Sequence, residues 1–300
     1  MKIPPFLQLN DKVAIIASAR KVSRAEMQPA IKLLNKWGLQ VVVYNHLFAH
    51  ENQFAGADNL RAADLQNALD DKDIKAIFMA RGGYGTLRII DHLNFSKFNK
   101  KPKWIIGFSD ITVLHSHIQT KFKIATLHAA MPITFGKDEL STFSLKESLF
   151  GNFNSHSFKT KNSLNRIGIA NGKIVGGNLS LLYAMQGSKS DIKTKNKILF
   201  IEDLDEQLYH IDRMILSLKR ARKLSNLKAL IVGSMIDMKD NSIPYGKTAQ
   251  QIIYDAVKEY DYPVVFDFPA GHDVKNIPLF LGMKATVNIT KTNCELRFEI

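Results

Sequence analysis

Short runs of apolar residues alternate with longer segments in which apolar residues recur every three or four positions. In the first half of the chain the runs are KVAIIAS (12–18), LQVVVYN (39–45), IKAIFMA (74–80), KWIIGFS (103–109) and IATLHA (124–129), and the amphipathic segments are 23–38, 58–71, 86–93 and 111–122. Runs of this length are typical of buried strands, and strands separated by helices predict a parallel sheet covered on both faces. Ser23 and Glu26 fit a capping box at the start of the first helix, and Gly38 fits its end.

This pattern weakens in the middle of the chain and then resumes. The stretch GKDELSTFSLKESLFGNFNSHSFKTKNSLN (136–165) is rich in Ser, Asn, Lys and Phe, and it predicts at most one short helix. Beyond it the pattern predicts strands at 197–203, 227–235 and 262–270, helices at 207–224 and 248–260, and a hairpin at 284–300. We therefore expect an α/β fold with an N-terminal parallel-sheet domain (1–140), a linker (141–168) and a C-terminal α/β domain with a β-rich end (169–300).

Composition narrows the class of protein. The chain has 300 residues, of which 45% are hydrophobic and 23% charged, as expected of a globular protein with a sizeable core. Cys294 is the single cysteine, which excludes an internal disulfide and a cysteine-based zinc site. The run VAIIA near the N-terminus is too short for a signal peptide, and no stretch approaches the roughly 20 apolar residues of a membrane helix. These features predict a soluble, cytoplasmic protein.

A formal net charge of +13 raises the alternative of a nucleic-acid binder. The basic segments KFNKKPK (97–103), KTKNK (193–197) and KRARK (219–223) are scattered, and no stacking aromatic residues are interleaved with them. We therefore expect solvated basic faces that attract small anionic substrates, with no nucleic-acid or membrane partner.

Ser109 stands between a buried run and a helical segment, in WIIGFSDITVLHSHI (104–118). One interpretation is a helix cap or turn residue. The other is a nucleophile at the carboxyl end of a parallel strand, where functional crevices form, with the amide of Asp110 pointing at a developing oxyanion. The segment is not a nucleophile elbow of the G-x-S-x-G type, because Ile111 stands where that motif has glycine. Ser109 alone does not decide between the two.

Three further segments carry polar or glycine residues at predicted strand ends. In ARGGYGT (80–86) adjacent glycines follow a strand, which fits either a structural turn or an anion-binding loop. Glu202 ends the apolar run of LFIEDLDEQ (199–207), and the carboxylates after it, from Asp203 on, are interpreted as a solvated helix entry. His272 follows a strand in FPAGHD (268–273), so it is a candidate general base that Glu202 would orient.

The other histidines offer weaker candidates. His115 and His117 are two apart in a helical pattern, so they do not share a face for a metal ion. His128 ends a predicted strand and is a candidate to line the cleft. A serine, a base and an acid at strand ends together fill the three roles of a catalytic triad.

Taken together, the motifs resemble the LD-carboxypeptidase family of serine peptidases, which includes muramoyltetrapeptide carboxypeptidases and microcin C self-immunity peptidases. They occur in that family's order and rough spacing: RGGYG (81–85), GFSDIT (107–112), TLHAAM (126–131), VGGNLSLL (175–182), YHIDRMI (209–215) and AGH (270–272). The similarity extends over nearly the whole chain, from about residue 12 to residue 286.

The resemblance implies a triad of Ser109 as nucleophile, His272 as base and Glu202 as its acidic partner. It also implies an oxyanion hole formed by the amides of Asp110 and Gly83, an active site in the groove between two domains, and a homodimer. No metal or cofactor is required. The implied reaction is hydrolysis of the bond that joins an L-centre to a terminal D-amino acid, with release of D-alanine from a murein tetrapeptide during wall recycling.

Two departures from the family pattern border the expected substrate groove. The chain has ASARKVS (17–23) where a Ser-Pro turn is frequent, and His128-Ala129-Ala130-Met131 where His-Gly-Pro-Met is common. Arg81 and Arg213 are candidates to bind a substrate carboxylate, although each also suits a structural ion pair. Two alternatives stay open: a peptidase of the same family that acts on peptidyl-nucleotide conjugates, and a non-catalytic two-lobed binder of small anions.

Overall fold

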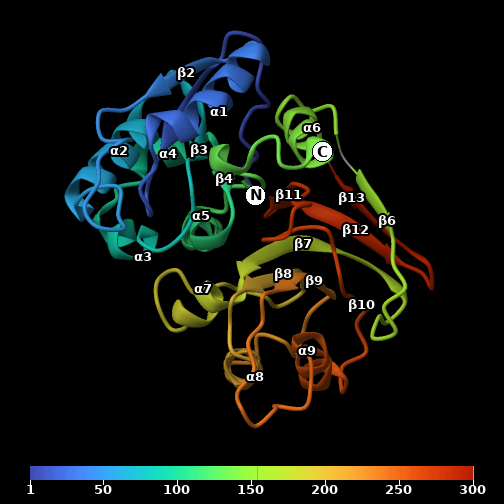
Figure 1. Cartoon of the computed structure of the whole chain (residues 1–300). Helices are drawn as coiled ribbons and strands as arrows, with labels where there is room; N and C mark the ends of the chain where they lie inside the picture. The colour runs from blue at the N-terminus through green and yellow to red at the C-terminus, as the bar shows by residue number, and fades with distance from the viewer. Residues whose placement is uncertain (154, 300) are drawn as a thin grey trace.

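The computed structural model describes residues 1–153 and 155–299, and it contains two β-sheets with helices packed on them (Figure 1). The first sheet has the order β11-β5-β4-β3-β1-β2. Its strands are β1 (Lys12–Ile16), β2 (Gln40–Val43), β3 (Ile74–Met79), β4 (Trp104–Gly107), β5 (Thr126–His128) and β11 (Leu279–Leu281). The five strands β1 to β5 pair in parallel, which confirms the predicted parallel sheet.

Helices join these parallel strands. They are α1 (Arg24–Lys36), α2 (Asp58–Asp70), α3 (Thr86–Ile89), α4 (Ser96–Lys100) and α5 (Thr112–Phe122), with the 3-10 turns η1 (Ile90–His92), η2 (Ser109–Ile111) and η3 (Pro132–Thr134). Ser23 caps α1 in the predicted capping box, because its Oγ accepts from the amide of Glu26 and the Glu26 carboxylate accepts from the amide of Ser23. The chain leaves α1 through Gly38, whose φ of +84° lies in the left-handed region.

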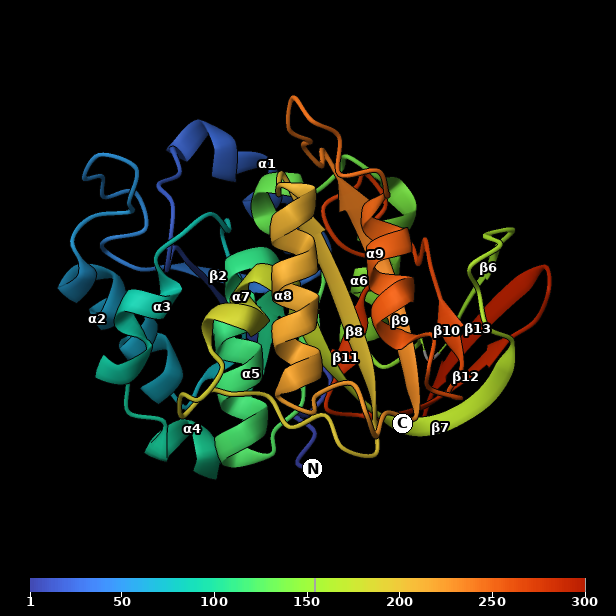
Figure 2. The same ribbon diagram turned by 90° about the horizontal axis from the view of Figure 1, so that it is seen from below.

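The second sheet has the order β10-β9-β8-β7-β12-β13-β6, and it supplies the β-rich end. Its strands are β6 (Ser155–Lys159), β7 (Gly168–Asn178), β8 (Lys197–Leu204), β9 (Ala229–Ile236), β10 (Val264–Val265), β12 (Lys284–Ile289) and β13 (Asn293–Phe298). Strands β7 to β10 pair in parallel, whereas β12, β13 and β6 pair antiparallel, so the predicted terminal hairpin is confirmed. Helices α8 (Leu208–Arg220) and α9 (Ala249–Val257) lie side by side over β8 and β9, and α7 (Leu179–Ala184) follows β7 (Figure 2).

Two segments link the halves more closely than the sequence pattern suggests. The stretch 141–168 holds most of α6 (Glu139–Leu149) and all of β6, which is an edge strand of the second sheet. Strand β11 returns from the C-terminal half and pairs antiparallel with β5 in the first sheet. The division into two domains at these boundaries therefore stays a proposal.

Some predicted elements are shorter than their sequence pattern. The strand expected over 262–270 is reduced to the two residues of β10, because Asp267 has a φ of +58° and Pro269 follows. The helix expected over 86–93 becomes α3 and the 3-10 turn η1.

Within residues 1–153 and 155–299, every helix is too short or too polar to cross a bilayer.

Candidate active site

Ser109 occupies a strained position at the carboxyl end of β4. Its φ is +62°, in the left-handed region that non-glycine residues rarely adopt. Among the described residues its side chain caps neither η2 nor α5 and makes no hydrogen bond. The cap interpretation is therefore wrong, because a cap needs a side-chain acceptor on a helix amide. The turn interpretation is correct, since Ser109 begins the 3-10 turn η2. The strain holds a half-buried hydroxyl at the start of a helix.

The glycine loop packs directly on Ser109. A Cβ atom placed on Gly82 would lie 2.9 Å from Ser109 Cβ and 3.0 Å from Ser109 Oγ, so a larger residue at position 82 would crowd the Ser109 side chain. Gly83 follows with a φ of +106°. The amides of Gly83 and Asp110 donate to no acceptor in the described part of the chain, as an oxyanion hole requires.

The Asp110 side chain has a structural role. It is fully buried, and its Oδ2 accepts from the amide of Thr86 at 2.8 Å, at the start of α3. Burial raises the pKa of this carboxyl above its ordinary value. Asp110 thus joins the glycine loop to the turn that carries Ser109.

Glu202 and His272 form a close buried pair. Their Oε2 and Nδ1 atoms are 2.6 Å apart, with Glu202 fully buried and the His272 side chain 11% exposed. This contact assigns the proton to Nδ1 and leaves Nε2 as the ring nitrogen that can accept a proton. Burial lowers the pKa of His272, but the charge and hydrogen bond of Glu202, with the charge of Asp203, raise it above the ordinary value.

Glu202 lies at a register shift between two parallel strands. Strand β8 continues to Leu204, so Glu202 lies within the strand and does not end it, contrary to the sequence pattern. Ile201 pairs with Val232 and Asp203 pairs with Met235, so β9 has one more residue than β8 at this point. Irregular pairing of this kind is common next to active sites.

Two side chains that the sequence pattern did not single out hold this loop. Ser234 Oγ accepts from the amide of His272 at 2.8 Å, and Asn276 Oδ1 accepts from the amide of Gly271 at 3.0 Å. Ser234 stands near the end of β9. It could have been singled out by the same sequence signal as Ser109, a serine at the end of an apolar run. Asn276 lies in a loop without periodicity, so nothing local marks it.

Gly271→Ala is expected to reduce kcat by at least about a hundredfold and to destabilise the fold by about 1–3 kcal/mol. Gly271 has a φ of +127°, and an added Cβ would lie 2.3 Å from Ser234 Oγ and 2.9 Å from Glu202 Oε2. Gly246→Ala is the matched control, because Gly246 has a φ of +81° and nothing within 4 Å of the added Cβ. Steady-state kinetics would measure kcat, and thermal melts would measure stability. Equal loss of activity in both variants would contradict the prediction.

The two halves of the chain meet at Phe108 and Thr112, which flank Ser109 in the chain. The Phe108 ring, one residue before Ser109, contacts the His272 ring edge-on at a centroid distance of 4.8 Å. Thr112 Oγ1 accepts from the amide of Asn178 at 2.9 Å, and a Cβ on Gly177 would lie 2.5 Å from that oxygen. No hydrogen bond joins Ser109 Oγ to His272 within the described residues, and such contacts often tighten only when substrate binds.

Comparison with known proteins identifies the family. Residues 13–129 match the sequence profile described as LD-carboxypeptidase N-terminal domain, and residues 171–287 match the one described as LD-carboxypeptidase C-terminal domain. The chain belongs to the LD-carboxypeptidase family. It is therefore a peptide hydrolase of the serine carboxypeptidase type.

Members of the LD-carboxypeptidase family align with almost all of the chain. A Bacillus subtilis protein named "Probable murein peptide carboxypeptidase" is 34% identical over 295 residues, which cover 95% of this chain and 91% of the relative. A Pseudomonas aeruginosa "Murein tetrapeptide carboxypeptidase" is 25% identical over 279 residues, which cover 89% and 90%.

Two solved structures share the fold of this chain. The muramoyltetrapeptide carboxypeptidase from Oxalobacter formigenes superposes with a TM-score of 0.86 at 28% identity, and the match covers 96% of this chain and 99% of that one. MccF in complex with glutamyl sulfamoyl guanosine also gives a TM-score of 0.86, at 19% identity and with 100% and 98% covered. At that identity the second similarity shows the fold alone.

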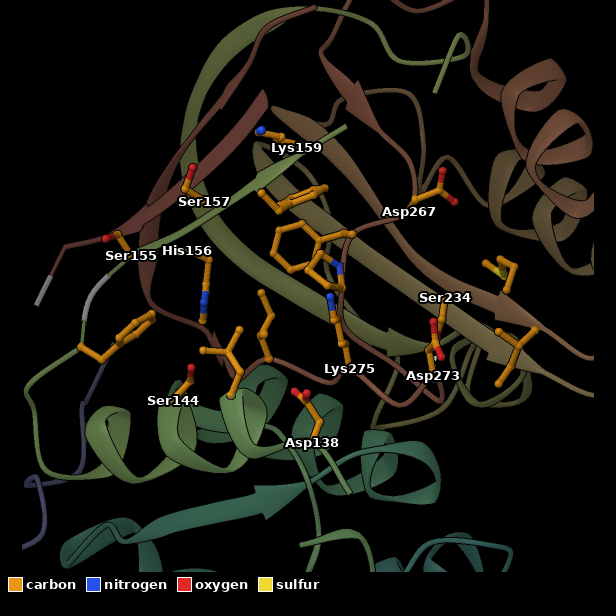
Figure 3. Close-up of a pocket in the computed structure, with 18 of the residues that line it drawn as sticks. Asp138, Ser144, Ser155, His156, Ser157, Lys159, Ser234, Asp267, Asp273 and Lys275 are labelled. Atoms are coloured by element: carbon orange, nitrogen blue, oxygen red, sulfur yellow. Dashed lines mark hydrogen bonds between the residues drawn. The ribbon is translucent and has the colours of Figure 1, made fainter. Parts of the chain in front are cut away.

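Two cavities adjoin the His272 loop of this LD-carboxypeptidase. The smaller, of about 120 Å³, is lined by Phe108 and His272 among others. The larger, of about 780 Å³, lies between α6, β6, the end of β9 and the loop after β10, with Lys275 extending into it (Figure 3). Asp138 and Asp273 line both cavities, so the two spaces share a wall.

The two arginines predicted to bind a substrate carboxylate lie in different surroundings. Arg81 follows β3 and is half-buried, with its Nη1 3.7 Å from Glu26 Oε1. Arg213 lies on the exposed side of α8, over the Tyr209 ring. The structure therefore brings Arg81, but not Arg213, into the region of the glycine loop.

Two expectations from the sequence are wrong. His128 does not line a cleft: it is fully buried between Phe108 and Phe200, and burial, with the nearby His115 and His272, lowers its pKa far below the ordinary value. Asp203 is not solvated: it is buried and accepts hydrogen bonds from Asn178 Nδ2 and the amides of Ser180 and Leu204. Burial and the charge of Glu202 raise the pKa of Asp203 to about 7.

In residues 1–153 and 155–299 no three His, Cys, Asp or Glu side chains lie close enough together to bind a metal ion.

Proposed function

We propose that this chain is a serine LD-carboxypeptidase that releases the terminal D-alanine from murein tetrapeptide. The buried pair of Glu202 and His272, with the His272 ring against Phe108 and therefore near the strained Ser109 in the chain, is the observation that carries the proposal. The names of the relatives, murein peptide and murein tetrapeptide carboxypeptidase, support this substrate.

In the proposed mechanism, His272 Nε2 takes the proton from Ser109 Oγ as that oxygen attacks the carbonyl carbon of the scissile bond. The amides of Gly83 and Asp110 hold the oxyanion, and Glu202 stabilises the imidazolium. The C–N bond then breaks, and His272 gives the proton to the departing amine. Water, deprotonated by His272, hydrolyses the serine ester and restores the hydroxyl.

The larger cavity offers space for the rest of the peptide. Its volume of about 780 Å³ lies within the range of about 300–1,000 Å³ typical of ligand pockets. Arg81, whose side chain is 31% exposed beside the glycine loop, is proposed to bind one of the several carboxylates of such a substrate.

The resemblance to the family also supports a homodimer and a cytoplasmic location.

Incubation of the protein with disaccharide-free murein tetrapeptide is expected to release D-alanine and leave a tripeptide, as measured by mass spectrometry. Activity should persist after exhaustive chelation, because the proposed relay needs no metal ion. An aminoacyl sulfamoyl adenylate is the comparison substrate. Faster cleavage of that conjugate than of the tetrapeptide would contradict the proposed substrate and favour the peptidyl-nucleotide alternative.

A further inference from the structure

The small cavity beside His272 is built from both halves of the chain. The first half contributes Phe108, Ala130 and Thr134 among others, and the second half contributes His272, Asp273, Val274 and Asn276. Its volume of about 120 Å³ is close to the ~150 Å³ that holds one benzene molecule, which has six heavy atoms. Alanine also has six heavy atoms, so the cavity matches a very small amino acid.

The charged groups on the walls of this cavity match the ends of a free amino acid. Lys137 is exposed and lies outside the ion pairs formed by residues 1–153 and 155–299. Asp138 and Asp273 each have one carboxylate oxygen already bonded, since Asp138 Oδ2 accepts from Ser141 and Asp273 Oδ1 accepts from the amide of Val274. The other oxygen of each carboxylate accepts no hydrogen bond within the described residues.

The position of His272 indicates which part of the substrate enters. A carboxypeptidase releases a single residue, and its general acid must contact the departing amine. His272 lines this small cavity, whereas the larger cavity has room for the longer acyl part. The released residue therefore fits the small cavity by both size and chemistry.

We propose that the small cavity is the subsite for the released amino acid, in which Lys137 binds its α-carboxylate and the free oxygens of Asp138 and Asp273 receive its amino group after cleavage. This inference rests on the proposed function, because it assigns the leaving residue of that reaction. Lys137 takes the terminal carboxylate in preference to Arg81, because Arg81 already faces Glu26 and Lys137 shares a cavity with His272.

The test compares two substrates: the murein tetrapeptide with its free C-terminal carboxylate (the acid), and the same peptide ending in D-alaninamide (the amide). Lys137→Gln is expected to raise KM for the acid about tenfold or more, with kcat and the KM for the amide unchanged, whereas Lys137→Arg keeps most of the preference for the acid. Lys146→Gln is the matched control, because Lys146 lies on α6 but lines neither cavity. Equal effects of Lys137→Gln on acid and amide, or an effect no larger than that of Lys146→Gln, would overturn the proposal, as would release of a terminal D-leucine as fast as D-alanine.

A binding measurement separates this inference from the proposed function. Saturation-transfer NMR with free D-alanine and D-alaninamide on wild type is expected to detect the acid, and to show at least tenfold weaker binding to Lys137→Gln. If wild type releases no D-alanine but binds it through Lys137, the subsite stands and the proposed reaction fails. If the tetrapeptide is cleaved and Lys137→Gln binds D-alanine as wild type does, the reaction stands and the subsite is wrong.

Discussion

Replacement of Ser109 by alanine is expected to reduce kcat by about four to six orders of magnitude while the protein stays folded. The hydroxyl makes no hydrogen bond in the described structure, so its removal leaves no buried partner unsatisfied. The measurement is D-alanine release from tetrapeptide, together with a thermal melt. Activity near that of wild type would exclude Ser109 as the nucleophile.

Ser109→Gly tests the backbone strain separately from the chemistry. Alanine keeps the unfavourable φ of +62°, whereas glycine adopts it freely, so the glycine variant should be equally inactive but more stable than the alanine variant by up to about 1 kcal/mol. Asn196→Gly is the control, because Asn196 also has a positive φ, of 58°, and precedes β8 at the end away from Glu202. That variant should gain stability and keep its activity.

Much of the fold could be predicted because burial on both faces of a parallel sheet leaves a strong local signal. The apolar runs that became β1 and β4 are continuous, the run of β3 is interrupted only by the exposed Lys75, and each is followed by a helical segment. Strand β11 was not predicted, because three residues without alternation carry no pattern, and it forms only by pairing with β5. Strand β6 likewise depends on β13, its partner at the edge of the second sheet.

Site residues could be predicted from the sequence only where a polar residue follows an apolar run typical of a buried strand. Ser109 stands just past β4, whereas His272 lies well beyond the two residues of β10 and reaches Glu202 through the loop that follows that strand. Ser234 and Asn276, which hold the His272 loop, act through contacts with residues 38 and 5 positions away, and no periodicity encodes these. Asp203 was misjudged because its neighbours in sequence, such as Asp205, are exposed, whereas its own side chain turns inward to Asn178.

Glu202→Gln is expected to lower kcat by about three to four orders of magnitude and to move the acidic limb of the pH profile to lower pH. The carboxylate accepts from His272 Nδ1 and stabilises the imidazolium, whereas a carboxamide carries no charge and its NH₂ favours the wrong tautomer. His272 must be neutral to act as a base, so wild-type activity is lost as pH falls through its raised pKa. Without the charge of Glu202, burial dominates and lowers that pKa, so the limb shifts downward.

The pH profile distinguishes an orienting acid from a merely structural carboxylate. Glu206→Gln is the matched control, because Glu206 lies a few residues further on and pairs with His210 Nδ1 at 2.6 Å, outside both cavities. It should change kcat by no more than about twofold and leave the acidic limb in place. A structural role for Glu202 would lower stability and activity together without moving the limb. A folded Glu202→Gln enzyme with an unshifted acidic limb would therefore exclude Glu202 as the partner of His272, because the charge that raises the pKa of His272 would then come from elsewhere.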